Sequence, residues 1–146
     1  MRRSCWGAGA PLARRRRREA AYAPPVPALA AADVPGGLVA PLTALYFTSR
    51  LCAACRETAD VVRAAAPEVP AVGVDVRERP DLVRALAVFE TPTLLLLDQR
   101  GRIRYAHVGN PDPSELWTYA REAWDSLEAE GELTRVTDAD LSPGGR

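Results

Sequence analysis

The chain has 146 residues, enough for one domain with a substantial core, and its 19 basic residues balance 19 acidic ones. All the basic residues are arginine, which excludes a lysine Schiff base or a lysine general base. A hydrolase that depends on histidine would have only His107 available, and this residue lies in a strand-like stretch. No apolar run approaches the roughly 18 residues of a membrane-spanning helix. An odd count of 3 cysteines with one close pair is typical of a redox site.

Residues 1–41 are predicted to be a disordered basic segment followed by an Ala/Pro-rich tail or linker. We expect the arginine run from Arg14 to Arg18 to make weak contact with an anionic surface. We predict no specific nucleic-acid binding, because no aromatic residues alternate with these arginines. Arg2 and Arg3 precede no sustained apolar core, so we predict no export signal and a cytoplasmic protein. A missing upstream segment would instead make the protein membrane-associated or exported.

The next stretch reads as a strand that ends in a pair of cysteines and turns into a helix. Leu45 to Thr48 is a short apolar and β-branched run, typical of a buried strand, and the sequence after the cysteines favours a helix that Pro67 stops. Cys52 and Cys55 have two residues between them, so their sulfur atoms are close enough to form a disulfide.

Cys52 is the predicted nucleophile of this pair. At the helix entrance it faces unpaired backbone N–H groups and the positive end of the helix dipole, which favour its thiolate. Arg50 and Arg56 add positive charge nearby and lower the Cys52 pKa further, and the thiolate is the form that attacks disulfides. Cys55 lies one turn further in and is expected to be less exposed, which suits a resolving cysteine.

Two other interpretations of the pair stay open on these residues alone. In the first, the cysteines are small buried residues with a structural role. In the second, they form half of a zinc site, for which the chain offers only Cys5 and His107 as further ligands. We predict no metal, because the spacing at a strand-to-helix corner favours redox chemistry over both alternatives.

The rest of the chain continues the alternation of strands and helices. The expected strand at 71–76 has a near-continuous apolar character that predicts burial on both faces, and with the first strand and helix it makes a right-handed βαβ unit. Pro92 stands just before a leucine-rich strand, at a position where its missing N–H is tolerated. The other predicted elements are a helix at 81–88, strands at 94–97 and 103–108, and a last helix that ends at Gly131.

The last helix has clear start signals, with Asp112 as N-cap and Pro113 at the first helical position. Its inward face is predicted to carry Leu116, Ala120, Ala123 and Leu127. The folded domain therefore spans residues 42–130, and residues 131–146 form a polar C-terminal tail that is expected to fray.

The element order, with Cys52-Ala53-Ala54-Cys55 after the first strand and Thr91-Pro92-Thr93 before the third, resembles that of the thioredoxin superfamily over residues 42–130. This resemblance implies an α/β fold, a thioredoxin-like three-layer α/β/α arrangement with a four-stranded mixed sheet. It also implies that the cysteine pair is exposed at one end of the sheet beside a cis Pro92. In such proteins the backbone of the residue before this proline, here Thr91, pairs with the substrate peptide, so Thr91, Pro92 and Leu51 are the expected substrate-binding residues.

The sequence departs from thioredoxins proper at several of these positions. Ala53-Ala54 replaces Gly-Pro between the cysteines, and Leu51 replaces a tryptophan. Tyr46 and Ala71 stand where thioredoxins have a buried aspartate and a lysine, so the proton relay to Cys55 would need the Tyr46 hydroxyl or water. We therefore expect a thioredoxin-like protein and not a housekeeping thioredoxin.

The predicted function is that of a thiol–disulfide oxidoreductase which exchanges disulfides with protein or peptide substrates through Cys52 and Cys55. Its expected partner is a reductase or another thiol donor, it needs no cofactor beyond the cysteine pair, and it acts as a monomer. The direction of the reaction depends on a reduction potential that the sequence does not give. The alternative is a non-catalytic thioredoxin-fold module that binds proteins and carries a basic tail.

Overall fold

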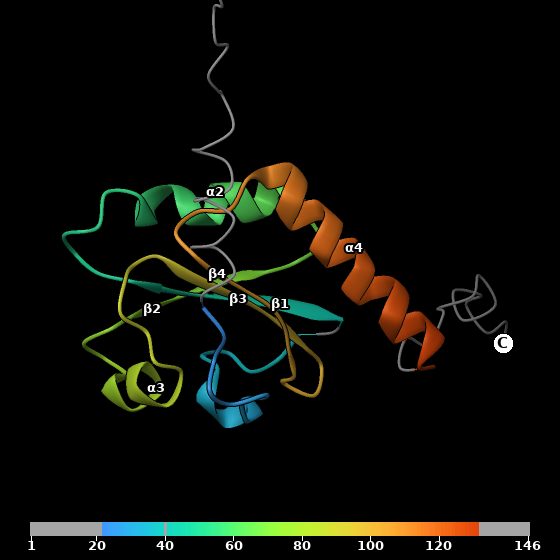
Figure 1. Cartoon of the computed structure of the whole chain (residues 1–146), viewed down its shortest axis with the longest axis horizontal. Coiled ribbons are helices and arrows are strands. Elements are labelled where there is room, and N and C mark those ends of the chain that lie inside the picture. The colour runs from blue at the N-terminus through green and yellow to red at the C-terminus, as the bar shows by residue number, and fades with distance from the viewer. Residues whose placement is uncertain (1–21, 40, 132–146) are drawn as a thin grey trace, which may run out of the picture.

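The computed structural model describes residues 22–39 and 41–131. Its elements, in chain order, are η1 (Ala31–Asp33), β1 (Leu42–Thr48), α2 (Cys55–Ala65), β2 (Ala71–Asp75), α3 (Pro80–Ala85), β3 (Thr93–Asp98), β4 (Ile103–Val108) and α4 (Pro113–Ala129). A four-stranded sheet lies between two layers, with α2 and α4 on one face and α3 on the other (Figure 1). The predicted three-layer α/β/α fold is confirmed.

The sheet has the strand order β2-β1-β3-β4. β1 pairs in parallel with β2, and the predicted βαβ unit is therefore present, whereas β1–β3 and β3–β4 are antiparallel. In the register, Phe47 near the end of β1 faces Thr93 at the start of β3. The segment after β1 and the segment before β3 consequently meet at one edge of the sheet.

Hydrophobic periodicity explains how the helices pack. The apolar positions predicted for α4 are all buried, and the Asp112 carboxylate caps the helix by accepting a hydrogen bond from the Ser114 N–H at 2.9 Å. The leucines of β3 alternate between the two faces of the sheet, so each face contributes to a separate core. The buried residues of α2 are Cys55, Thr58, Val62 and Ala65, of which Val62 and Ala65 belong to the hydrophobic core.

Strand β2 is not buried on both faces, which corrects the sequence-based expectation. It forms an edge of the sheet, and Gly73 in its centre is exposed. The Tyr46 ring of β1 lies over this glycine, because a Cβ added to Gly73 would come within 2.8 Å of the Tyr46 hydroxyl oxygen. Apolar composition predicted burial on both faces, but here an aromatic neighbour lies over the exposed centre of an edge strand.

Residues 22–39 pack against the sheet, which corrects the prediction of a tail or linker over 1–41. In Figure 1 this segment lies on the same face of the sheet as α3. Leu29 and Val34 within it are only 7% and 3% exposed. The prolines of this stretch disfavour regular structure, yet an extended chain with apolar side chains at intervals still covers an open sheet face.

Polar contacts hold the same segment in place. The Tyr22 hydroxyl donates to the Leu86 carbonyl at 3.0 Å, and the Arg79 guanidinium donates to the Asp33 carbonyl and carboxylate at 3.0 and 3.1 Å. Arg79 also pairs with Asp81 at 2.7 Å, and this hydrogen bond lowers the pKa of Asp81 to about 2. One guanidinium therefore joins η1 to the first turn of α3.

The β3–β4 turn contributes a further attachment. The Leu29 N–H donates to the Gly101 carbonyl at 2.9 Å, and a β-bridge joins Ala28 to Arg102. Gly101 has a φ of 78°, and a Cβ at this position would collide with the Leu29 carbonyl. Glycine is therefore required both by the left-handed turn and by the close approach of the two chains.

The remaining predictions for the chain ends fall outside the described residues. These are the basic run Arg14–Arg18 and the polar tail over 132–146. Within residues 22–39 and 41–131, no helix has the length and apolar character needed to cross a membrane.

Candidate active site

Cys52 and Cys55 form a disulfide at the junction between β1 and α2, with their Cα atoms 5.4 Å apart. Cys52 is half-buried, whereas Cys55 is only 5% exposed. The predicted difference in exposure is therefore present. A partner thiolate approaching from solvent would meet the Cys52 sulfur first, and the Cys55 sulfur would be the leaving group.

The start of α2 positions a hydrogen-bond donor on the outer sulfur. The Cys55 N–H donates to the Cys52 sulfur, with 3.2 Å between nitrogen and sulfur. The next two N–H groups, of Arg56 and Glu57, donate instead to the Ala53 and Ala54 carbonyls, both at 3.2 Å. The Cys52 sulfur thus lies at the helix end that favours negative charge, but it faces one N–H group and not the several unpaired ones predicted.

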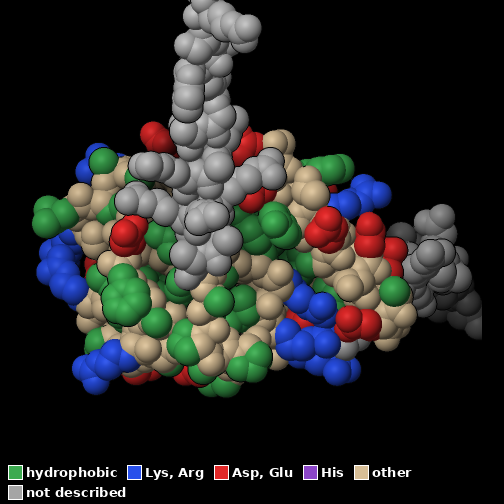
Figure 2. All heavy atoms as spheres, in the orientation of Figure 1, with side chains coloured by type: hydrophobic (Ala, Val, Ile, Leu, Met, Phe, Trp, Pro, Cys, Tyr) green, Lys and Arg blue, Asp and Glu red, His purple; other side chains and the backbone are tan. Residues whose placement is uncertain are grey.

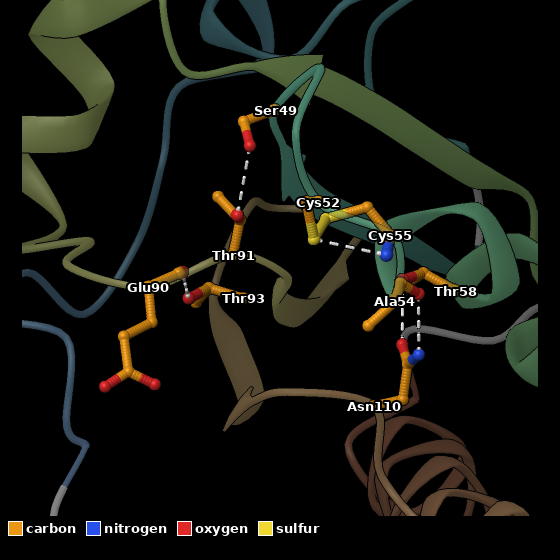
Figure 3. The surroundings of a disulfide bond; sticks show 9 residues. All are labelled: Ser49, Cys52, Ala54, Cys55, Thr58, Glu90, Thr91, Thr93 and Asn110. Atoms are coloured by element: carbon orange, nitrogen blue, oxygen red, sulfur yellow. Dashed lines mark hydrogen bonds between the residues drawn. A yellow bond between two sulfur atoms is a disulfide. The ribbon is translucent and has the colours of Figure 1, made fainter.

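The second part of the site is the Thr91–Pro92 segment, which precedes β3. The Thr91–Pro92 bond is cis and Pro92 is buried, in agreement with the resemblance. The Thr91 hydroxyl lies 3.4 Å from the Ser49 hydroxyl, which belongs to the loop that leads to Cys52 (Figure 3). The fold therefore brings together two loops that are about 40 residues apart in the sequence.

Thr91 carries the backbone that the resemblance assigns to substrate pairing. The carbonyls on either side are occupied, since Glu90 accepts from the Thr93 hydroxyl at 2.7 Å and Pro92 accepts from the Gly109 N–H at 2.7 Å. No backbone hydrogen bond joins Thr91 itself to another residue of the described ranges. Its N–H and C=O are thus the groups that an added peptide strand would need.

The predicted substrate-binding residue Leu51 and the two predicted pKa-tuning arginines surround the cysteine pair on the surface. The Leu51 side chain is 97% exposed, and Arg50 and Arg56 are exposed as well. Among the described residues, neither arginine forms an ion pair. Their effect on Cys52 stays a prediction.

Phe89 is a surface residue near the site that sequence reasoning missed. The helix α3 ends at Ala85 instead of residue 88, because Ala87 takes a φ of 51° and the Val88 N–H returns to the Val83 carbonyl at 2.9 Å. This turn buries Val88 and leaves Phe89 90% exposed, two residues before Thr91. An aromatic residue predicts burial, so the sequence contained no signal for this position.

Thr58 and Asn110 were also missed. Asn110 follows β4 and donates from its side-chain nitrogen to the Ala54 carbonyl at 2.8 Å, while its side-chain oxygen accepts from the Thr58 hydroxyl at 2.7 Å (Figure 3). Thr58 is fully buried beneath the helix start. Asn110 looks like ordinary turn chemistry in the sequence, so its contact with the cysteine loop had no local signature.

Tyr46 and His107, which were considered for chemical roles from the sequence, are engaged in packing. The Tyr46 hydroxyl lies over Gly73, as described above, and no hydrogen bond to Cys55 is present among the described residues. His107 is 6% exposed, its ring stacks on Tyr105 with centroids 6.0 Å apart, and its Nδ1 lies 3.0 Å from the Gly109 carbonyl oxygen. His107 is therefore part of the packed sheet face.

No family model matches the sequence, and no curated protein sequence matches it. Solved structures do resemble it: thioredoxin 1 of Thermosipho africanus has 20% identity and a TM-score of 0.50, over 59% of this chain and 98% of that chain. A thioredoxin of Nicotiana alata has 27% identity and a TM-score of 0.49, over 58% and 75% of the two chains. One of Fasciola hepatica has 26% identity and a TM-score of 0.46, over 56% and 80%. At 20% identity, the likeness to the Thermosipho protein establishes a shared fold.

Proposed function

We propose that this chain, which has the fold of thioredoxin and a cysteine pair that closes at the start of a helix, is a thiol–disulfide oxidoreductase acting on protein or peptide disulfides. The observation that carries the proposal is the hydrogen bond from the Cys55 N–H to the sulfur of the more exposed Cys52. A sulfur that accepts this bond at a helix N-terminus is stabilised as an anion when the disulfide opens.

The reaction is a pair of exchanges that conserves atoms and electrons. The Cys52 thiolate attacks a substrate disulfide, forms a mixed disulfide and releases one substrate thiolate. The Cys55 thiolate then attacks the Cys52 sulfur, releases the second substrate thiolate and closes the Cys52–Cys55 bond. Two electrons pass from the protein dithiol to the substrate, and the two thiol protons end on the substrate. A reductase or another thiol donor restores the dithiol by the reverse sequence.

Substrate recognition in this proposal combines backbone pairing with apolar contact. The N–H and C=O of Thr91 would pair with an extended substrate, with Pro92 shaping the groove beside the disulfide. Leu51, directly before Cys52, and Phe89, two residues before Thr91, are 97% and 90% exposed. Exposed apolar side chains of this size favour substrates with apolar residues near the disulfide, since their burial is favourable on contact.

The proposal includes the other expectations drawn from the sequence. The cysteine pair itself is the only redox group, without a metal or a bound cofactor, and Arg50 and Arg56 support the Cys52 thiolate by their charge. The protein acts as a monomer in the cytoplasm. The run Arg14–Arg18 adds a weak contact with anionic surfaces and no specific nucleic-acid binding.

Equilibration with glutathione tests the function directly. The full chain with Cys5→Ser, which removes the third thiol, is incubated in buffers of fixed glutathione ratio, and the oxidised fraction is measured by alkylation and mass spectrometry. We expect one reversible two-electron transition between about −270 and −120 mV, the range of dithiol oxidoreductases. A pair that does not equilibrate, or a Cys52 alkylation midpoint near the free-cysteine pKa of about 8.5, would favour the non-catalytic binding module instead.

Leu51→Ser and Phe89→Ser are each expected to lower kcat/KM for a disulfide-bonded peptide with apolar flanking residues by about tenfold. This corresponds to about 1.4 kcal/mol, roughly half the gain from fully burying such a side chain. Reduction of the Cys52–Cys55 bond by dithiothreitol, a molecule too small to span the loops, should keep its rate. Val39→Ser is the matched control, since Val39 is also exposed, at 46%, but precedes the opposite end of β1. An equal loss in that control would remove the recognition role.

A further inference from the structure

The peptide group between Ala54 and Cys55 is hydrogen-bonded at both ends. Its N–H points to the Cys52 sulfur at 3.2 Å, and its carbonyl oxygen accepts from the Asn110 side-chain nitrogen at 2.8 Å (Figure 3). The same oxygen accepts a longer bond, at 3.2 Å, from the Glu57 N–H within the first turn of α2. Because a trans peptide unit is planar, with its N–H and C=O in opposite directions, a contact that fixes the oxygen also fixes the direction of the N–H. Asn110, through the shorter of the two bonds to this oxygen, therefore helps to fix the donor that faces the sulfur and does not hydrogen-bond to the sulfur itself.

The Asn110 side chain has only one favourable orientation in this position. The Thr58 hydroxyl has a single proton, and it donates to the Asn110 oxygen at 2.7 Å in preference to the Ala54 carbonyl at 3.5 Å. The Asn110 nitrogen is then directed at the Ala54 carbonyl. The reversed amide would place its oxygen against that carbonyl oxygen, two acceptors without a proton between them. Thr58 is 0% exposed, so water does not compete for its hydroxyl.

Asn110 is also held from its own side. It follows Gly109, whose N–H donates to the Pro92 carbonyl at 2.7 Å, and it precedes the N-cap of α4. The turn between β4 and α4 is thereby attached to the cis-proline segment and to the start of α2. The carboxamide joins two rigid parts of the fold across 56 residues of sequence.

This arrangement acts differently on the two redox states. In the disulfide, the Cys52 sulfur is neutral and a weak acceptor, so the Cys55 N–H contributes little. In the reduced protein the same N–H faces a thiolate, and a hydrogen bond to a charged acceptor is roughly twice as strong. A hydrogen bond to the carbonyl end of a peptide also polarises its N–H, which strengthens the second bond in the chain. The contact therefore stabilises the reduced form more than the oxidised form.

We propose that Asn110, oriented by Thr58, is a positioning residue that aims the Cys55 N–H at Cys52 and thereby sets the balance between the Cys52 thiolate and the Cys52–Cys55 disulfide. The inference rests on the proposed function and adds to it a residue that controls the reduction potential. The hydrogen bonds of the Asn110 side chain go to Ala54 and Thr58 and not to the reacting sulfur atoms. It is therefore a positioning residue and not a catalytic one.

The test uses the full chain with Cys5→Ser as background. Asn110→Ala is expected to raise the pH midpoint of Cys52 alkylation and to shift the glutathione equilibrium about tenfold toward the disulfide, a potential about 30 mV more negative. Asn110→Asp keeps the shape and the Thr58 contact but turns a negative oxygen toward Ala54, so both shifts should be at least as large. Thr58→Val should shift both in the same direction by less, because Asn110 keeps its donor. The matched control Thr118→Val, which removes a similar hydrogen bond from Thr118 to the Ser114 carbonyl at 2.9 Å on exposed α4, should shift neither.

The outcomes separate this inference from the proposed function. If the background protein does not equilibrate with glutathione, the function fails and the inference fails with it. If it equilibrates normally, but both Asn110 variants keep its potential and its alkylation midpoint, only the positioning role is overturned. Lower thermal stability in the Asn110 variants with an unchanged midpoint overturns it as well, since that result describes a structural contact. Should Asn110→Ala fail to fold, Asn110→Asp and Thr58→Val decide by the same two measurements.

Discussion

Cys55→Ser is expected to stop turnover and to trap the substrate on the protein. The Cys52 thiolate can still open a substrate disulfide, but serine at position 55 cannot attack the resulting mixed disulfide, so the adduct accumulates to about one per chain. Non-reducing mass spectrometry after mixing the reduced variant with a disulfide-bonded peptide measures the adduct and its site.

Two companion variants make this result specific. Cys52→Ser should form almost no adduct, because the remaining thiol of Cys55 is buried, and turnover should fall to the rate of the buffer thiols. Cys5→Ser should keep full turnover, since Cys5 is not part of the pair. Adducts that form on Cys55 as fast as on Cys52 would reverse the assigned roles, and an adduct on neither cysteine would remove the oxidoreductase function.

The parts of the fold that could be predicted from the sequence are those that a local pattern determines. The four leucines of β3 and the N-cap of α4 gave elements with nearly the observed bounds, because burial and capping depend on neighbouring residues. The end of α3 was missed because Ala87 adopts a φ of 51°, a conformation usually indicated by glycine. Residues 22–39 were missed because their docking depends on an open sheet face and on Arg79, which are distant in sequence.

The candidate site divides in the same way. The cysteine pair and Pro92 were found because both belong to short motifs at a fixed order along the chain. Asn110 was not, because its role comes from one side-chain contact to the Ala54 carbonyl that exists only after β4 and α2 have been packed together. Phe89 was assigned no role because a hydrophobic residue on the surface has the same sequence signal as one in the core.

These missed residues share a physical origin that bears on function. The two cysteines of the motif supply the reacting sulfur atoms. Because only cysteine can supply a thiol, these positions can be recognised in the sequence. Residues that orient a peptide group or contact a substrate act through position, and many residue types occupy such positions. In this chain, we therefore expect reduction potential and substrate choice to depend on contacts such as those of Asn110 and Phe89.

Asp98→Asn is expected to lower the free energy of unfolding by about 2–4 kcal/mol, the largest stability effect among the single substitutions considered. The Asp98 side chain is 0% exposed at the end of β3, and its carboxylate accepts from Arg102 Nε at 2.7 Å and Arg104 Nε at 2.8 Å. Its other oxygen accepts from the N–H groups of Arg100 and Arg102 at 2.9 and 3.0 Å. An asparagine would turn an N–H₂ group toward one of these sets of donors.

The size of this effect depends on the arginines. Both guanidinium groups also reach Glu130, at 2.9 and 3.3 Å, and Figure 2 shows basic and acidic side chains gathered near the end of α4. The Arg102 side chain is 37% exposed, so water and Glu130 would partly compensate its charge, and the loss should be below that of a fully buried pair. The cost comes mainly from the unsatisfied donors inside the hairpin.

The same carboxylate predicts a pH dependence. Burial raises the pKa of Asp98, but hydrogen bonds from Arg104 and from the N–H groups of Arg100 and Arg102 more than compensate, so its pKa is lowered from the ordinary value. Its contribution is therefore complete above the unfolded-state pKa of about 3.9 and is lost as the pH falls through the lower folded-state pKa. The stability difference between the native chain and Asp98→Asn should be constant near neutral pH and shrink below about pH 4.

Urea unfolding followed by circular dichroism at a series of pH values measures this difference. Asp60→Asn is the matched control, because Asp60 pairs with Arg63 at 2.7 Å but both side chains are more than 70% exposed, at 74% and 71%. We expect it to change stability by less than about 1 kcal/mol at any pH. Asp98 lies at the end of β3 opposite Thr93 and the disulfide, so the glutathione equilibrium should not move. A loss for Asp98→Asn as small as that of the control, or one that persists unchanged at pH 2, would mean that the hairpin does not depend on this charge.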